Sequence, residues 1–188
     1  LPYVKEVVTS GEYFRDVAKY LYADILIDGS EDDRLLATTL LLELVESYPR
    51  NRRFALRHIS LLVERDLDLQ ALQAADVFIT SKDEYNRHSE DVYLARLWIA
   101  RAYMRLGSAE KAVSEFEMID QSSSPSSFPS WARSWFELTR AQINDLQNQR
   151  ADAIRSYHKV IKMHADYGSE EILSAAQDGV KVPYTLGL

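Results

Sequence analysis

The chain has 188 residues, of which 46% are hydrophobic and 27% are charged, a composition that argues against intrinsic disorder and suits one ordinary domain. The formal net charge is −7, from 22 basic and 29 acidic side chains, which excludes general attraction to nucleic acid or to an anionic membrane surface. Cysteine is absent, so disulfides, cysteine zinc sites and thiol nucleophiles are excluded.

No apolar run is long enough to cross a bilayer, because the densest one, residues 35–45, is interrupted by Thr38, Thr39 and Glu43. We therefore expect no membrane insertion by this segment. The chain begins at Leu1 without a basic and apolar leader, so we expect a processed protein or an excised domain. The sequence does not distinguish a cytoplasmic from an extracytoplasmic location.

Apolar residues recur at spacings of three and four between sparse glycines and prolines, which predicts successive helices and no strands. Ser30, Ser81 and Ser169 precede acidic residues and are predicted N-caps. Residues 121–130, QSSSPSSFPS, predict a surface loop from which Phe128 packs back onto the helices. The predicted helices lie near 11–28, 31–48, 52–66, 69–81, 90–106, 109–121, 130–146, 149–166 and 169–178.

One pattern repeats at intervals of roughly 40 residues. A small residue is followed four positions later by a large apolar residue, and three positions after that by an aliphatic or small residue. Close contact between two paired helices needs such a small side chain, and each pair leaves a face that the next pair must cover. The four matches are Ala37, Leu41, Leu44; Ala74, Phe78, Ser81; Ala112, Phe116, Ile119; and Ala153, Tyr157, Val160.

The best match, Ala100, Tyr103, Gly107, Ala112 and Phe116, resembles the tetratricopeptide repeat family. In the second unit Asp68-Leu69 stands where the family has its turn glycine, and in the fourth Asn148 stands there. The resemblance implies an all-α, right-handed α-α superhelix of about four helix pairs with a C-terminal capping helix. Residues 1–188 then form one domain, with a helical lead-in at 1–17, repeats at 18–167, and a cap and tail at 168–188.

The resemblance also implies that the first helix of each pair lines a concave groove that binds a protein or peptide. Lys19 is also one of the positions expected to face this groove. The lysine, asparagine and arginine positions of a carboxylate clamp carry mostly apolar residues here, so the clamp is not expected. The expected partner-binding residues are Tyr22, Leu26, Leu56, Ile59, Val63, Leu94, Leu97, Arg101, Met104, Arg105, Trp135, Leu138 and Gln142.

Chemistry-bearing residues form no catalytic pattern. The four histidines have no metal-ligand spacing, although Glu84 and His88 share a helix face. Residues 28–33 lack the acidic spacing of a calcium loop and predict a turn with an N-cap. Arg50, Arg52, Arg53 and Arg57 are interpreted as a solvated basic face. We expect no enzyme activity, cofactor or metal.

The sequence thus favours a non-catalytic scaffold that binds a peptide or helix of a partner in an apolar groove. Three alternatives remain open. The solenoid supports an enzymatic or membrane domain outside this segment, or its groove is covered by its own terminal segment or by a homodimer. The third alternative is a small apolar ligand or lipid in the groove.

Overall fold

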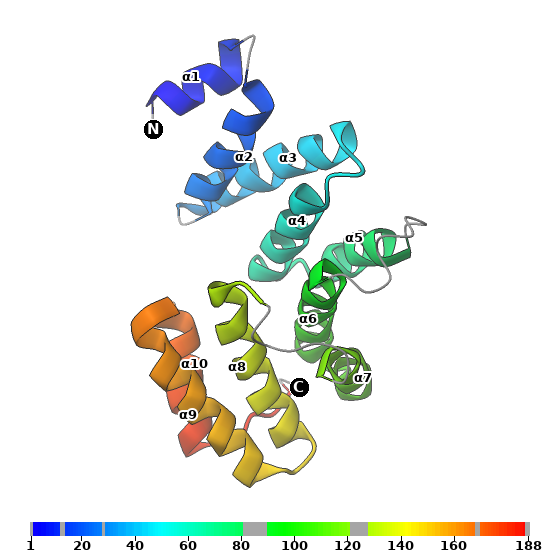
Figure 1. Ribbon diagram of the computed structural model, residues 1–188, viewed down its shortest axis with the longest axis vertical. Helices are drawn as coiled ribbons and strands as arrows, with labels where there is room; N and C mark the ends of the chain where they lie inside the picture. Colours follow the sequence, from blue (N-terminus) through cyan, green and yellow to red (C-terminus); the bar gives the residue numbers. More distant parts are fainter. Residues whose placement is uncertain are drawn as a thin grey trace. The chain divides into compact units, whose positions relative to one another are not determined.

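The computed structural model describes residues 2–11, 14–27, 29–80, 90–120, 128–167 and 170–186, and every regular element within these ranges is an α-helix (Figure 1). The predicted all-α class is confirmed for this part of the chain. The helices are α1 (Pro2–Ser10), α2 (Arg15–Leu26), α3 (Glu31–Ser47), α4 (Arg52–Glu64), α5 (Asp68–Thr80), α6 (Glu90–Arg105), α7 (Ala109–Asp120), α8 (Ser130–Leu146), α9 (Arg150–Tyr167) and α10 (Glu170–Lys181).

Contacts between residues divide the chain into two compact units, unit 1 (Leu1–Lys82) and unit 2 (Asp83–Leu188). In unit 1, α2 pairs with α3 and α4 pairs with α5, while α1 packs on α2 and α3 packs on α4. The apolar sides of α2 and α3 bury each other, which gives the unit its main core. This core contains Tyr22, Ala23, Leu26, Ala37, Leu40, Leu41, Leu44 and Leu61.

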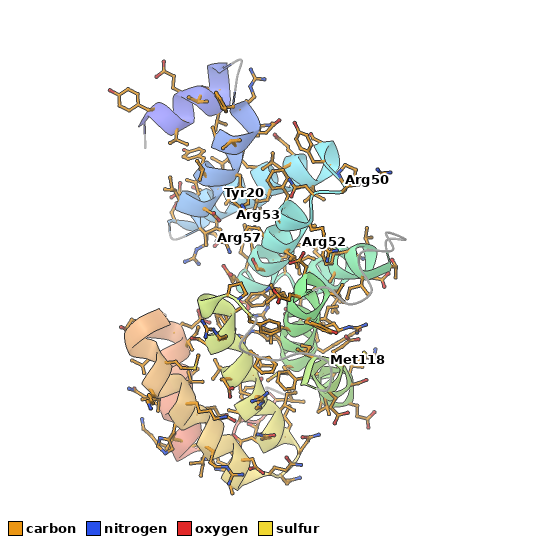
Figure 2. The ribbon with its side chains drawn as sticks, in the orientation of Figure 1. Tyr20, Arg50, Arg52, Arg53, Arg57 and Met118 are labelled. Carbon is orange, nitrogen blue, oxygen red and sulfur yellow. The ribbon has the colours of Figure 1, made fainter. Side chains whose placement is uncertain are left out.

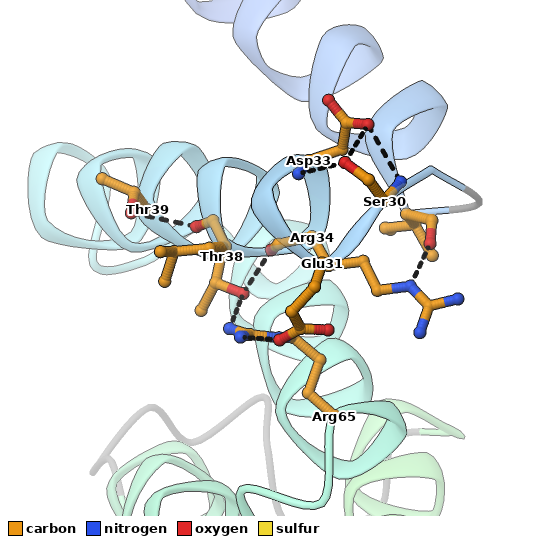
Figure 3. A network of polar contacts seen from close by, with 9 residues as sticks. Ser30, Glu31, Asp33, Arg34, Thr38, Thr39 and Arg65 are labelled. Atoms are coloured by element: carbon orange, nitrogen blue, oxygen red, sulfur yellow. Dashed lines mark hydrogen bonds and ion pairs between the residues drawn. The ribbon is translucent and has the colours of Figure 1, made fainter.

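The α2–α3 turn of unit 1 is fixed by a capping box, as its sequence predicts. The Asp33 amide donates to Ser30 Oγ at 3.3 Å, and the Ser30 amide donates to Asp33 Oδ2 at 2.9 Å (Figure 3). From α4, Arg65 reaches back to α3 and donates to Glu31 at 2.6 Å and to Thr38 at 3.0 Å. These contacts attach the second helix pair of unit 1 to the first.

In unit 2, α6 pairs with α7 and α8 pairs with α9, and α10 packs on both α9 and α8. Figure 1 shows α8, α9 and α10 side by side. The core between them contains Leu138, Ala141, Ala153, Tyr157, Val160, Ile172 and Ala176. Phe128 is buried with its ring edge-on to Phe136, at a centroid distance of 5.5 Å. Its predicted return to the helices is confirmed.

Three of the four predicted alanine contacts are fully buried: Ala37, Ala112 and Ala153. The fourth, Ala74, is wrong by one residue, because Ala75 is the fully buried alanine of α5 and Ala74 is only half-buried. Ala71, Ala75 and Phe78 are spaced by four and three, so they lie together on the buried face of α5, and Ala74 lies outside that face.

The turns of three helix pairs, α4–α5, α6–α7 and α8–α9, use left-handed residues. Gly107 has φ of 73° and Asn148 has φ of 61°, as expected from the repeat. In the second pair the left-handed residue is Asp66, with φ of 57°, so the expected place of this turn at residues 68 and 69 is wrong. Asp68 already lies in the first turn of α5. The predicted N-caps Ser81 and Ser169, and most of the 121–130 loop, lie outside the described residues.

None of the described helices combines the length and the apolar character that crossing a bilayer requires.

Candidate functional site

Helix α2 and its N-cap residue present four large apolar side chains to solvent. Phe14, Val17, Leu21 and Ile25 are 79%, 55%, 50% and 44% exposed. Val17, Leu21 and Ile25 are spaced by four and lie on one side of the helix, while Phe14 precedes the helix as its N-cap residue, with φ of 61°. We call these four residues the α2 apolar face. Burying such side chains against a partner would be favourable, and contiguous apolar patches on a surface commonly mark interaction sites.

The opposite side of α2 explains why this face points outward. Ala18, Tyr22, Ala23 and Leu26 are buried, and the last three belong to the core shared with α3. Lys19 helps to hold this side of α2 against α3, because its Nζ lies 2.7 Å from Glu43 Oε2 on α3. With its rotation set by these contacts, α2 leaves the face with Leu21 at its centre uncovered by the described residues.

The expected groove is not the exposed face. Eight of its residues are buried: Tyr22, Leu26, Ile59, Val63, Leu94, Leu97, Met104 and Leu138. The prediction that they offer an exposed apolar surface is therefore wrong, because these side chains fill the cores of the helix pairs. Leu56, Arg101, Trp135 and Gln142 are half-buried and Arg105 is exposed. On α2 the exposed register lies one residue before the predicted one, at Leu21 and Ile25 instead of Tyr22 and Leu26.

In unit 2, Arg101 contacts Trp135. The guanidinium carbon lies 3.8 Å from the Trp135 ring centroid, and Nη1 lies 3.5 Å from Thr139 Oγ1. Trp135 also packs edge-on against the buried Trp98, at a centroid distance of 5.9 Å. A cation over an indole face is a favourable arrangement. The structure thus brings together two of the predicted binding residues, Arg101 and Trp135, as a packed pair.

The C-terminal segment of unit 2 is fastened to a buried carboxylate, Asp145. Arg150 Nη1 lies 3.0 and 3.1 Å from its two oxygens, and the Tyr157 hydroxyl donates to Oδ2 at 2.9 Å. The main-chain amide of Tyr184 donates to the same oxygen at 2.8 Å. Arg150 also donates to the Val180 carbonyl at 2.7 Å. The Asp145 side chain is completely buried, so these donors replace the water it has lost.

Burial raises the pKa of two tyrosine hydroxyls in this region, those of Tyr157 and Tyr184. Burial raises the pKa of Tyr157 first, and the hydrogen bond to Asp145 raises it further. Burial also raises the pKa of Tyr184, which the positive charges of Arg101 and Arg105 partly oppose. Tyr157 is therefore a stable proton donor, and the Tyr184 side chain lies within the electrostatic reach of the predicted groove cations Arg101 and Arg105.

A surface pocket of about 630 Å³ lies at the α3–α4 turn of unit 1, lined by residues 48–53. The lining residues are Tyr48, Pro49, Arg50, Asn51, Arg52 and Arg53, and we call this segment the arginine turn. Asn51 caps α4, since its Oδ1 accepts from the Phe54 amide at 3.4 Å. No acidic residue lies in the first turn of α4.

Three of the four arginines of this region lie beside different neighbours (Figure 2). Arg57 pairs with Asp24 at 2.7 Å, and Arg52 lies over the Phe78 ring at 5.2 Å from its centroid. Arg53 lies near Tyr20, where its charge lowers the pKa that burial raises. The solvated basic face inferred from sequence is therefore divided between the α2 side and the α5 side of α4.

Among the described residues, no group of three histidine, aspartate or glutamate side chains is placed to hold a metal ion. Glu84 and His88 lie outside these residues. Asp33 of the 28–33 segment is used in the capping box.

Comparison of the chain with family models, with curated proteins and with solved structures finds no match in any of the three. The site residues are therefore argued from geometry alone.

Proposed function

We propose that the chain is a non-catalytic scaffold of tetratricopeptide-like helix pairs, stacked as a right-handed superhelix, that binds an amphipathic helix of a partner protein. The α2 apolar face carries this proposal. Phe14, Val17, Leu21 and Ile25 are all more than two fifths exposed, although buried side chains of the same types fill the core beside them. Apolar anchors at helical spacing suit a helix laid along them.

The face differs from ordinary exposed apolar residues in being continuous. A single exposed leucine on a protein surface needs no explanation, because much of any protein surface is apolar. Val17, Leu21 and Ile25 form a stripe along one side of the twelve-residue helix α2, and Phe14 precedes the helix as its N-cap residue. Covering it with a partner helix would bury the stripe and leave the charged side chains of α2 in water.

The test compares two matched leucines of unit 1. Leu21 on α2 is 50% exposed and Leu42 on α3 is 43% exposed, and Leu42 is outside the α2 apolar face. Partners captured from the native host are identified by mass spectrometry, purified and titrated with each variant. We expect Leu21→Glu to weaken binding about tenfold or more, since a charge would be placed in an apolar contact, while Leu42→Glu leaves it unchanged. Equal affinities for wild type and Leu21→Glu would refute the proposal.

A second candidate is that the repeat covers its own binding surface, and it is supported by the contact of Tyr184 with Asp145 and by its closeness to Arg101 and Arg105. In this case the C-terminal segment occupies the surface where a partner was expected in unit 2.

Light scattering after size exclusion tests the homodimer. If wild type is a dimer and Leu21→Glu is a monomer, the partner of the α2 apolar face is a second copy of the chain. A role in supporting a domain outside this segment would instead appear as capture of that domain.

A further inference from the structure

The arginine turn combines positive charge with an open surface depression. Arg50, Arg52 and Arg53 contribute to the lining of this depression, whose volume is about 630 Å³. Guanidinium groups bind carboxylates and phosphates through paired hydrogen bonds, so exposed arginines at this turn suit an oxyanion.

Two of these guanidiniums are available to a ligand. Arg50 and Arg53 are exposed and form no ion pair with the described residues. Three other cations of unit 1 are ion-paired: Lys19 with Glu43, Arg57 with Asp24 and Arg65 with Glu31. In a chain with net charge −7, unpaired neighbouring arginines are a local reversal of sign. Asn51 already caps the start of α4.

The turn is held in place before any ligand binds. The Asn51 amide donates to the Tyr48 carbonyl at 2.8 Å, and the Tyr48 ring packs edge-on against Phe54 at 6.0 Å. The Tyr48 hydroxyl donates to Asp16 of α2, and Phe54 packs against Tyr20 at 5.5 Å. The Asp16 carboxylate near the turn therefore already accepts from Tyr48. A preformed turn loses little conformational entropy on binding.

We propose that the arginine turn binds carboxylate side chains of an acidic peptide segment, with Arg50 and Arg53 as the two anchoring cations. A short acidic peptide suits the site better than nucleic acid, because a duplex presents about one negative charge per 1.7 Å and the acidic remainder of the chain would repel it more strongly than a few carboxylates. The proposal rests on the proposed function only in taking a protein segment as the ligand. It uses residues separate from the α2 apolar face.

The experiment titrates wild type with a synthetic heptaglutamate peptide, with inorganic phosphate and with a short single-stranded DNA, and follows backbone amide shifts at low and at physiological salt. We expect the peptide to bind, with shifts centred on residues 48–57. The double variant Arg50→Gln/Arg53→Gln should weaken the peptide about tenfold or more, since two charge-assisted contacts are lost. Binding should weaken with salt, as it does for exposed charges.

The matched control is Lys5→Gln/Arg15→Gln, which removes the same charge from unit 1 at two exposed residues outside the pocket. It should keep the peptide affinity within about twofold of wild type. Equal loss in both double variants would show a general charge effect and overturn the site. Phosphate binding without peptide binding, or DNA binding tighter than the peptide, would replace the proposed ligand class. Leu21→Glu should leave peptide binding unchanged, so failure of the α2 proposal and failure of this one are told apart.

Discussion

Gly179 shows how closely α10 approaches α9. A β-carbon added at this glycine would lie 2.3 Å from Cζ of the Tyr157 ring, well inside contact distance. The ring cannot move aside freely, because the Tyr157 side chain is buried and its hydroxyl is bonded to Asp145. Glycine is unfavourable inside a helix, so its presence within α10 is explained by this approach and not by helix preference.

We therefore expect Gly179→Ala to destabilise the protein by about 1–3 kcal/mol, the usual cost of overpacking a core, despite the better helix propensity of alanine. Urea unfolding followed by circular dichroism measures this. Gln177→Ala, at an exposed position of the same helix, is the control and should change stability by no more than about 0.5 kcal/mol. A stabilised Gly179→Ala variant would mean that Tyr157 is not held where the structure places it.

At the level of elements, α3 depends on the capping box at its start. Ser30 and Asp33 satisfy each other's amides, and Ser30 Oγ also donates to Asp33 Oδ2 at 2.7 Å (Figure 3). These hydrogen bonds lower the pKa of Asp33 below its usual value. Arg65, which directly follows α4, donates to Glu31 in the first turn of α3, so the start of α3 contacts both helix pairs of unit 1.

Replacing Ser30 by alanine removes the acceptor for the Asp33 amide. We expect a loss of about 1 kcal/mol, the typical effect of deleting an N-cap side chain. The measurement is chemical denaturation, with Ser30→Asn as the control because asparagine is also a good N-cap residue. If both variants are equally unstable, the loss comes from something other than capping.

The helices and several turns could be predicted because their signals are local. Apolar spacing and N-cap residues lie within a few positions of the structure they specify, and Gly107 and Asn148 were expected in the left-handed conformation that they adopt. The exposed face could not be predicted in the same way. Periodicity shows which residues share a face, but which face is buried depends on helices elsewhere in the chain, and the expected register missed Leu21 and Ile25.

The Asp145 site was missed for a related reason. Its partners Arg150, Tyr157 and Tyr184 include a contact across 39 positions, and no short motif marks such a group. The one indirect signal was Gly179, which comes directly after the predicted helix at 169–178 and lies inside α10, where it approaches Tyr157. The arginine turn was visible only as a run of basic residues, since sequence does not show that residues 48–53 line an open surface depression.

For the whole molecule, stability should depend on pH through His58. This side chain is buried on α4, and burial lowers its pKa below the ordinary value of 6.5. The unfolded chain then binds the proton more tightly than the folded chain, so the free energy of unfolding is largest above the unfolded pKa. It declines as the pH falls below about 6.5 and stops declining once the folded pKa is passed.

The measurement is the free energy of unfolding in urea at a series of pH values between about 7.5 and 5. His58→Gln should remove this part of the pH dependence, because glutamine does not titrate. The carboxylates of Glu31 and Asp33, whose pKa values are lowered by hydrogen bonds, should contribute a separate decline at lower pH in both proteins. If the free energy of unfolding of His58→Gln falls with pH as steeply as that of wild type over this range, another group causes the decline.

The fastening of Tyr184 to Asp145 also has a consequence for the order in which unit 2 assembles. The α8–α9 pair closes a short turn and already brings Arg150 and Tyr157 to the carboxylate, whereas Tyr184 must return across 39 residues. Closing longer loops costs more entropy, so we expect the tail to dock onto an acceptor that has already formed. Contacts made after the folding transition state affect mainly the unfolding rate. The contacts of the last residues of unit 2 should therefore affect its unfolding rate more than its folding rate.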